Sequence, residues 1–203
     1  WENRPAARFC AFPRRVLTRA HLVHNRSATL DANPIRDNFT SAHEDHSDPL
    51  VHVDVTYHVG SAREEARRSG FAHFFEHLMF EGSQNIERGE YSRLVEMNGG
   101  VLNANTSQDR TYHYEILPSN QLELGLWLES ERLLHAKVDV IGIETQRQVV
   151  KEEKRQRMDN QPYGSILEET FSHAYREHPY RWTPIGSAQY IDQATLDEFI
   201  DFY

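Results

Sequence analysis

The sequence predicts an α+β fold, because segments with the two-residue period of strands occur together with segments that have the period of helices. Residues 50–60 alternate apolar and polar side chains, as a half-buried strand does. Residues 101–107 and 110–117 look like two further strands around a polar turn at 108–109. Several of the remaining segments have apolar residues at helical spacing.

Residues 1–42 are expected to be irregular and are not assigned to the fold that follows. They show no sustained alternation, and Pro5, Pro13 and Pro34 interrupt them. Seven Arg and three acidic residues make the segment basic, which is typical of an organelle transit peptide and leaves a mitochondrial location as an alternative. Residues 43–203 are predicted to belong to one folded domain, beginning with a polar turn at 43–49.

Six helices are predicted from capping residues, glycine stops and apolar spacing. Gly99 and Gly100 end the second helix, and Asn120 and Glu123 are spaced as a capping pair at the start of the third. The third helix is strongly apolar, so we expect it in the core. The predicted ranges are 69–80, 87–97, 120–134, 141–158, 163–176 and 196–202.

Composition limits the class of protein. The chain has 203 residues, a formal net charge of −9 and one cysteine, so it can bury a sizeable core and has no internal disulfide. No run of about 18 apolar residues predicts a transmembrane segment. The acidic body argues against nucleic acid as a partner. It would suit basic or extended peptides, although a solvated acidic surface is the commoner cause of such a charge.

The segment His73-Phe74-Phe75-Glu76-His77 predicts a catalytic metal site. With about 100° per helical residue, His77 lies at about 40° and Glu76 at about −60° from His73, so the three side chains share one arc. Imidazoles are good zinc ligands, and a carboxylate beside an open coordination position can act as a general base. A chance pair among 12 His is the alternative. The surrounding aromatic residues favour a metal, because burying three polar groups without a partner would be costly.

A third protein ligand is expected on the helix 141–158. Gln146, Val149, Val150 and Glu153 form one stripe at i, i+3, i+4 and i+7 spacing. The two valines mark this stripe as buried, so Glu153 is expected to point inward. A buried carboxylate needs a cationic partner, and this makes Glu153 the candidate ligand.

Other assignments for this helix remain open at this stage. Glu152 lies about 100° away from Glu153, and Glu144 lies about 180° away, so both are weaker candidates. Glu153 could instead form an ordinary helix-surface ion pair with Arg157, four residues later.

Several motifs, in the right order, resemble the pitrilysin family of zinc peptidases. Residues 70–83 (GFAHFFEHLMFEGS) resemble its metal-binding helix, and 99–107 (GGVLNANTS) resemble its glycine-plus-strand element. Residues 149–156 with 159–164 resemble the helix that brings the third ligand, and the 76-residue spacing from His77 to Glu153 is compatible with the family. The resemblance covers about residues 43–203, which would be the N-terminal portion of the zinc peptidase catalytic domain, and it is closest to bacterial relatives of mitochondrial processing peptidase.

The resemblance implies a zinc-dependent endopeptidase. His73, His77 and Glu153 would bind one Zn²⁺ per chain, with Glu76 activating water. A strand containing Asn103 and Ala104 would pair with an extended peptide substrate. The implied fold is that of mitochondrial processing peptidase, a mostly antiparallel sheet with helices packed on one face, incomplete at its C-terminal end. A catalytically inactive peptide-binding or assembly subunit, and a scaffold without metal, are the alternatives.

The resemblance also implies a partner, and the sequence departs from the family pattern at two places. A second half-clamshell, either a C-terminal half or another subunit, would enclose the substrate, so the isolated chain may be an inactive fragment. The family's first strand is not recognisable before residue 43, and Gln146 stands where some relatives carry Glu. The compartment is not determined; a soluble protein of the bacterial periplasm or cytoplasm is expected.

Overall fold

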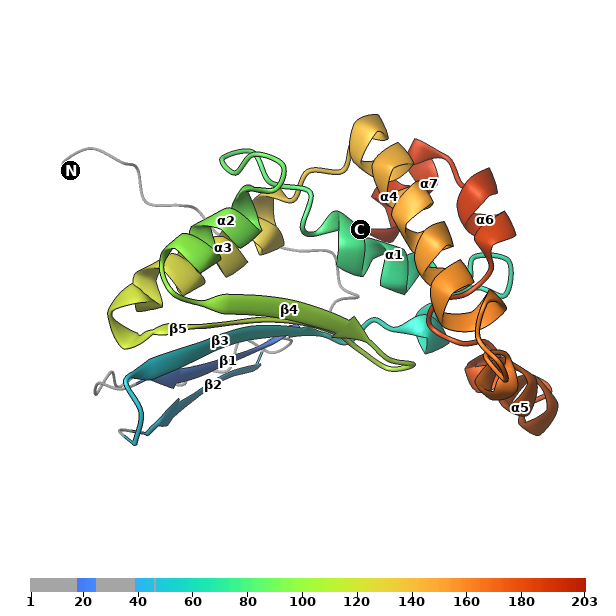
Figure 1. Cartoon of the computed structure of the whole chain (residues 1–203), viewed down its shortest axis with the longest axis horizontal. Coiled ribbons are helices and arrows are strands. Elements are labelled where there is room, and N and C mark those ends of the chain that lie inside the picture. The colour runs from blue at the N-terminus through green and yellow to red at the C-terminus, as the bar shows by residue number, and fades with distance from the viewer. Residues whose placement is uncertain (1–17, 25–38, 46) are drawn as a thin grey trace.

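The computed structural model describes residues 18–24, 39–45 and 47–203. These residues form a five-stranded sheet with helices over one of its faces (Figure 1). The sheet order is β2-β1-β3-β5-β4. Its strands are β1 (Thr18–His24), β2 (Phe39–Glu44), β3 (Leu50–Tyr57), β4 (Val101–Thr106) and β5 (Thr111–Pro118).

The helices α2 and α3 lie together over the sheet, and α1 lies over the end of β4 (Figure 1). The helices α4, α6 and α7 gather beyond that end, and α5 lies apart from both groups (Figure 1). A π-helical segment, Arg155–Asp159, continues α4. The bounds are α1 (Phe71–Leu78), α2 (Glu90–Met97), α3 (Leu122–His135), α4 (Val140–Lys154), α5 (Ile166–Ala174), α6 (Ala188–Gln193) and α7 (Leu196–Phe202), with short 3₁₀ turns at Ser61–Arg63, Ser119–Gln121 and Pro179–Arg181.

The sheet is mostly antiparallel, as expected, because β3 pairs antiparallel with both β1 and β5, and β4 with β5. Only the β1–β2 pairing is parallel. The α+β fold class is therefore confirmed.

The expectation of an irregular segment over residues 1–42 is wrong for two stretches. β1 and most of β2 lie in this segment, and β1 pairs with β3 along its length. Neither strand shows sustained alternation in sequence, so its own side-chain pattern does not identify it. Its place in the sheet comes from pairing with another strand, which a local pattern does not report. The division of the chain into units 1–42 and 43–203 remains a prediction.

The core has two parts. Beneath α2 and α3, Val51 of β3 and Leu117 of β5 pack in one cluster with Leu128 of α3. Beside the sheet, an aromatic cluster joins α1 to α7, where the rings of Phe71 and Phe74 stack on Phe199 at 4.8 and 4.7 Å. This second cluster fixes α1 against the C-terminal helices.

α3 differs from its prediction. It begins at Leu122 with no side-chain cap, so the capping pair of Asn120 and Glu123 is wrong. Its buried face includes Leu128 but also the charged Glu129 and Arg132, whereas Leu126 and Leu134 are more than two-fifths exposed. The apolar residues of this segment predicted an apolar buried face. The buried face is partly charged, because the sheet beneath α3 carries polar groups that Glu129 and Arg132 face.

The C-terminal helices are predicted in part. α7 has the predicted bounds, with Thr195 and Glu198 forming a capping box. α5 is shorter than its predicted range, and α6 was not predicted, because six residues give too short a pattern. Within the described ranges, no helix has the length and apolar character needed to cross a bilayer.

Candidate metal centre

α1 is held at its N-terminus by a buried carboxylate from the preceding loop. Gly70 precedes the helix with φ of 102°, a left-handed conformation that glycine adopts without strain. The backbone N–H groups of Gly70 and Ala72 donate to the Glu64 carboxylate at 2.9 and 2.8 Å. Because Gly70 has no side chain to cap the helix, Glu64 satisfies N–H groups that would otherwise lack partners.

This contact predicts a pH dependence of stability. Burial raises the pKa of Glu64 to about 8, although the hydrogen bonds from Ala72 and Gly70 oppose the rise. A carboxyl whose pKa is raised on folding stabilises the fold at low pH and loses that contribution as pH rises through about 8. Urea unfolding at pH 5 to 9 should show Glu64→Gln gaining stability relative to the unmodified chain as pH increases. Parallel pH profiles for the two proteins would contradict this.

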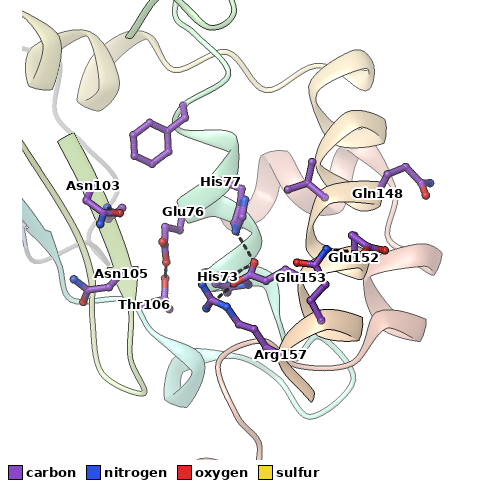
Figure 2. A pocket seen from close by; sticks show the side chains of 14 residues that line it. His73, Glu76, His77, Asn103, Asn105, Thr106, Gln148, Glu152, Glu153 and Arg157 are labelled. Atoms are coloured by element: carbon purple, nitrogen blue, oxygen red, sulfur yellow. Dashed lines mark hydrogen bonds and ion pairs between the residues drawn. The ribbon is translucent and has the colours of Figure 1, made fainter. Parts of the chain in front are cut away.

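Three side chains from two helices converge at the predicted centre. His73 and His77 extend from α1 towards Glu153 near the end of α4 (Figure 2). Nε2 of His73 lies 3.4 Å from Oε2 of Glu153, and Nε2 of His77 lies 3.2 Å from the same oxygen. One ligand atom from each residue lies within 4.8 Å of the others, and among the described residues no second group of this kind is found.

The spacing and chemistry of this trio fit a zinc ion. With zinc–ligand bonds of about 2.0–2.1 Å, neighbouring ligands of a tetrahedron lie about 3.3 Å apart, close to the two distances above. Oε2 of Glu153 is buried and has no hydrogen-bond partner in the described part of the chain, so a cation would satisfy it. Burial opposes ionisation of Glu153, but the imidazoles of His73 and His77 outweigh it and hold the pKa of this carboxyl below its usual range.

The other two acidic residues of α4 lie away from the centre. Glu144 pairs with Arg147 and its side chain is 60% exposed, and Glu152 pairs with Arg155. The stripe that selected Glu153 is only partly correct, because Val150 is buried but Val149 is 44% exposed. Val149 lines a cleft instead of the core, which the helical period cannot distinguish.

The alternative partner of Glu153 is also present. Nη1 of Arg157 lies 2.7 Å from Oε1 of Glu153, as an i,i+4 ion pair. Because the imidazoles face Oε2, the two oxygens of Glu153 have different partners (Figure 2). The ion pair and the metal site were considered as alternatives in the sequence, but the structure accommodates both.

Glu76 lies beside the trio and has two contacts that sequence analysis missed. The hydroxyl of Thr106 on β4 donates to Oε2 of Glu76 at 2.5 Å. The fully buried ring of His113 on β5 lies with Nε2 at 3.3 Å from the Glu76 backbone carbonyl. Alternation placed His113 on one face of its strand, but no local signal paired it or Thr106 with a helix some 30 residues earlier.

The trio, Glu76 and Thr106 line an open cleft of about 970 Å³ between β4 and α4. β4 is the edge strand of the sheet, bonded to β5 on one side only. Asn103 and Ala104 both line the cleft, and the Ala104 N–H donates to the Asn103 side chain at 2.8 Å. The structure therefore places the two predicted substrate residues across the cleft from the predicted ligands His73, His77 and Glu153.

Gln146, which departs from the family pattern, lies outside the group formed by His73, His77 and Glu153. Its amide Nε2 donates to the buried carboxylate of Glu81, which also pairs with Arg88. A glutamate at this position would place two carboxylates together, so the amide is the side chain that Glu81 can accept from at neutral pH.

A helix carrying H-x-x-E-H, joined by a carboxylate from a second helix, is the arrangement of the inverted class of zinc peptidases. The chain belongs to peptidase family M16, the insulinase family, whose model matches residues 40–186. This match confirms the resemblance noted in the sequence.

Relatives support this assignment. The chain is 39% identical over 154 residues to a protein named zinc protease PqqE from Helicobacter pylori, covering 76% of this chain and 35% of that protein. It is 28% identical to the probable mitochondrial-processing peptidase subunit beta of Schizosaccharomyces pombe, covering 75% and 32%. The chain therefore spans about a third of the length of these curated relatives.

A solved structure shows the same fold. The first half of the periplasmic protease PqqL from Escherichia coli superposes with a TM-score of 0.68 at 27% identity, covering 78% of this chain and 35% of that one. The α+β arrangement is thus shared with a known protease structure.

Proposed function

We propose that this chain carries the metal centre of a zinc-dependent endopeptidase that hydrolyses extended peptides. The observation that carries the proposal is the convergence of His73, His77 and Glu153, with Glu76 beside them on the same cleft. The three ligands would hold one zinc ion per chain. When bound, zinc would lower the pKa of a water towards about 7 and polarise the substrate carbonyl.

Glu76 is the general base in this proposal. Its carboxylate lies outside the ligand trio, and among the described side chains only Thr106 donates a hydrogen bond to it. A carboxylate oxygen of Glu76 accepts a proton from the attacking water and then returns it to the leaving amine nitrogen. The Thr106 hydroxyl holds the carboxylate towards the cleft during both transfers.

The substrate backbone is proposed to pair with the edge of β4. Asn103 and Ala104 lie on this strand and line the cleft. Addition of a peptide strand to a sheet edge uses main-chain hydrogen bonds, so it tolerates varied side chains. The N–H of Ala104, now bonded to the Asn103 side chain, is available to a substrate carbonyl once that side chain moves.

A second half-clamshell, in a longer polypeptide or another subunit, is proposed to close the cleft. The chain spans about a third of its curated relatives, and one structural relative is described as the first half of a protease. That relative is also described as periplasmic, which favours the periplasm over the bacterial cytoplasm for this chain.

Zinc analysis tests the centre directly. The purified chain, stripped with chelator and returned to zinc, should bind one ion, and His77→Ala or Glu153→Ala should weaken binding at least about 100-fold, beyond the effect typical of outer partners. His173→Ala, an exposed histidine of α5, is the control and should bind normally. Folded chain that binds no zinc would refute the proposal.

Peptide cleavage then separates the endopeptidase from the alternative, a non-catalytic peptide-binding subunit. The complete product of the encoding gene should cleave an unstructured fluorogenic peptide in a zinc-dependent manner. Zinc and peptide binding without turnover would favour the non-catalytic subunit.

A further inference from the structure

We propose that Arg157 sets the coordination mode of Glu153, by holding one carboxylate oxygen so that only the other is offered to the metal. The inference rests on the proposed zinc centre and adds a positioning residue beyond the four site residues. It assigns a role in metal binding to a side chain that sequence analysis considered only as a helix-surface partner.

The two oxygens of Glu153 face different groups. Oε1 lies 2.7 Å from Nη1 of Arg157, whereas Oε2 lies 3.2 and 3.4 Å from the imidazoles of His77 and His73. Oε2 has no hydrogen-bond partner among the described residues. In Figure 2 the Arg157 side chain extends towards the Glu153 carboxylate. The carboxylate is therefore already divided into a guanidinium-binding oxygen and an oxygen that faces the two imidazoles.

This division has a consequence for the reaction. A carboxylate can bind a metal ion through one oxygen or through both. If Glu153 used both, its second oxygen would compete for the coordination position that a catalytic zinc site keeps open for water. The ion pair with Arg157 engages Oε1 and so favours binding through Oε2 alone.

The burial of Glu153 distinguishes this contact from an ordinary surface ion pair. The neighbouring residue, Glu152, pairs with Arg155, and the side chains of Arg155 and Glu152 are 60% and 44% exposed. Such exposed pairs contribute little. The Arg157 side chain is 74% exposed, but the Glu153 side chain is only 15% exposed, so the carboxylate end of this ion pair is shielded from water.

The backbone around Arg157 is also unusual. Arg157 belongs to the π-helical segment Arg155–Asp159, which directly follows α4. π-Helical turns within α-helices occur frequently at functional sites. Arg157 lines the cleft together with the metal ligands, so this segment presents it to the site.

Zinc affinity measured by chelator competition tests the role of Arg157. Removing a positive charge beside a cation site would by itself raise the affinity. We nevertheless expect Arg157→Ala to lower it about 10-fold, because loss of a partner that orients a ligand costs about 10–100-fold. The zinc affinity of Arg157→Lys, which keeps the charge but lacks the planar guanidinium, should lie between those of the unmodified chain and Arg157→Ala. Arg155→Ala is the matched control from the same helical segment and should bind zinc normally.

Cobalt substitution tests the coordination mode without an activity assay. The cobalt-loaded chain should show the intense visible absorption of four-coordinate Co²⁺. Arg157→Ala should show the weaker bands of a higher coordination number, as Oε1 joins Oε2 on the metal. An unchanged zinc affinity or an unchanged cobalt spectrum in this variant would overturn the inference. Failure of the unmodified chain to bind either metal would instead refute the zinc centre itself.

Discussion

Replacing Glu76 by glutamine is expected to reduce peptide hydrolysis by the complete gene product at least about 100-fold, while one zinc ion stays bound. Glutamine keeps the size of the side chain and an oxygen that can accept the hydrogen bond from Thr106. It lacks a carboxylate able to take a proton from water near neutral pH. The loss should therefore appear in kcat, with little change in KM.

Two measurements secure this interpretation. Zinc content and unfolding midpoint should match those of the unmodified protein, because Glu76 is neither a predicted ligand nor part of the aromatic cluster. Glu96→Gln, an exposed carboxylate on α2, is the matched control and should leave hydrolysis unchanged. Normal turnover by Glu76→Gln would mean that another group acts as the base.

Replacing Arg132 by methionine is expected to destabilise the metal-free chain by about 3–5 kcal/mol, the usual cost of breaking a buried ion pair by removing one partner. The Arg132 side chain is 1% exposed and its Nε lies 3.1 Å from Oε1 of Glu129. Its Nη1 donates at 2.8 Å to the backbone carbonyl of Met79, which caps the C-terminal end of α1. The guanidinium also lies 4.8 Å from the ring of Phe80 and 4.7 Å from that of Tyr91.

The groups left behind explain the size of the effect. Glu115 on β5 is 1% exposed, and neither of its carboxylate oxygens has a hydrogen-bond partner among the described residues. Burial, reinforced by the charge of Glu129, raises the pKa of Glu115 well above its usual range. Without Arg132, Glu129 would become the uncompensated charge. The expected loss is a large part of the 5–15 kcal/mol by which a domain is typically stable.

Urea unfolding in the presence of a chelator measures this cost without a contribution from metal. Arg155→Met, in which an exposed arginine is lost from a surface pair, should unfold at the normal midpoint. Adding Glu129→Gln to Arg132→Met should recover part of the stability, because the stranded charge is removed. If Arg132→Met alone shifts the midpoint no more than Arg155→Met, the buried network does not stabilise the fold.

The sequence predicted best what depends on neighbours within a few turns. The 3.6-residue period placed His73, Glu76 and His77 on one face of α1, and the structure brings both imidazoles to one oxygen of Glu153. The same period separated Glu153 from Glu144 and Glu152 on α4. β3 and β5 were predicted because alternation is a local property of a strand.

The contacts that sequence analysis missed join segments far apart in the chain. Thr106 reaches Glu76 across 30 residues, and Arg132 reaches Met79 across 53. β1 was missed because its pairing partner, β3, rather than its own side-chain pattern, makes it a strand. On β5 the buried side chains include Thr111, His113 and Glu115, so polarity alone does not identify the buried face of this strand.

By itself the sequence determined the chemistry of the centre, two imidazoles and a base on one helix with a carboxylate expected from another, because helical geometry fixes relative directions locally. Only the tertiary structure decided how these groups are held: which oxygen of Glu153 faces the histidines, which hydroxyl orients Glu76, and which buried charge anchors the end of α1. Those choices depend on how α1 and α4 approach each other and the sheet. That approach is set by packing and hydrogen bonds between distant segments, and no local pattern encodes it.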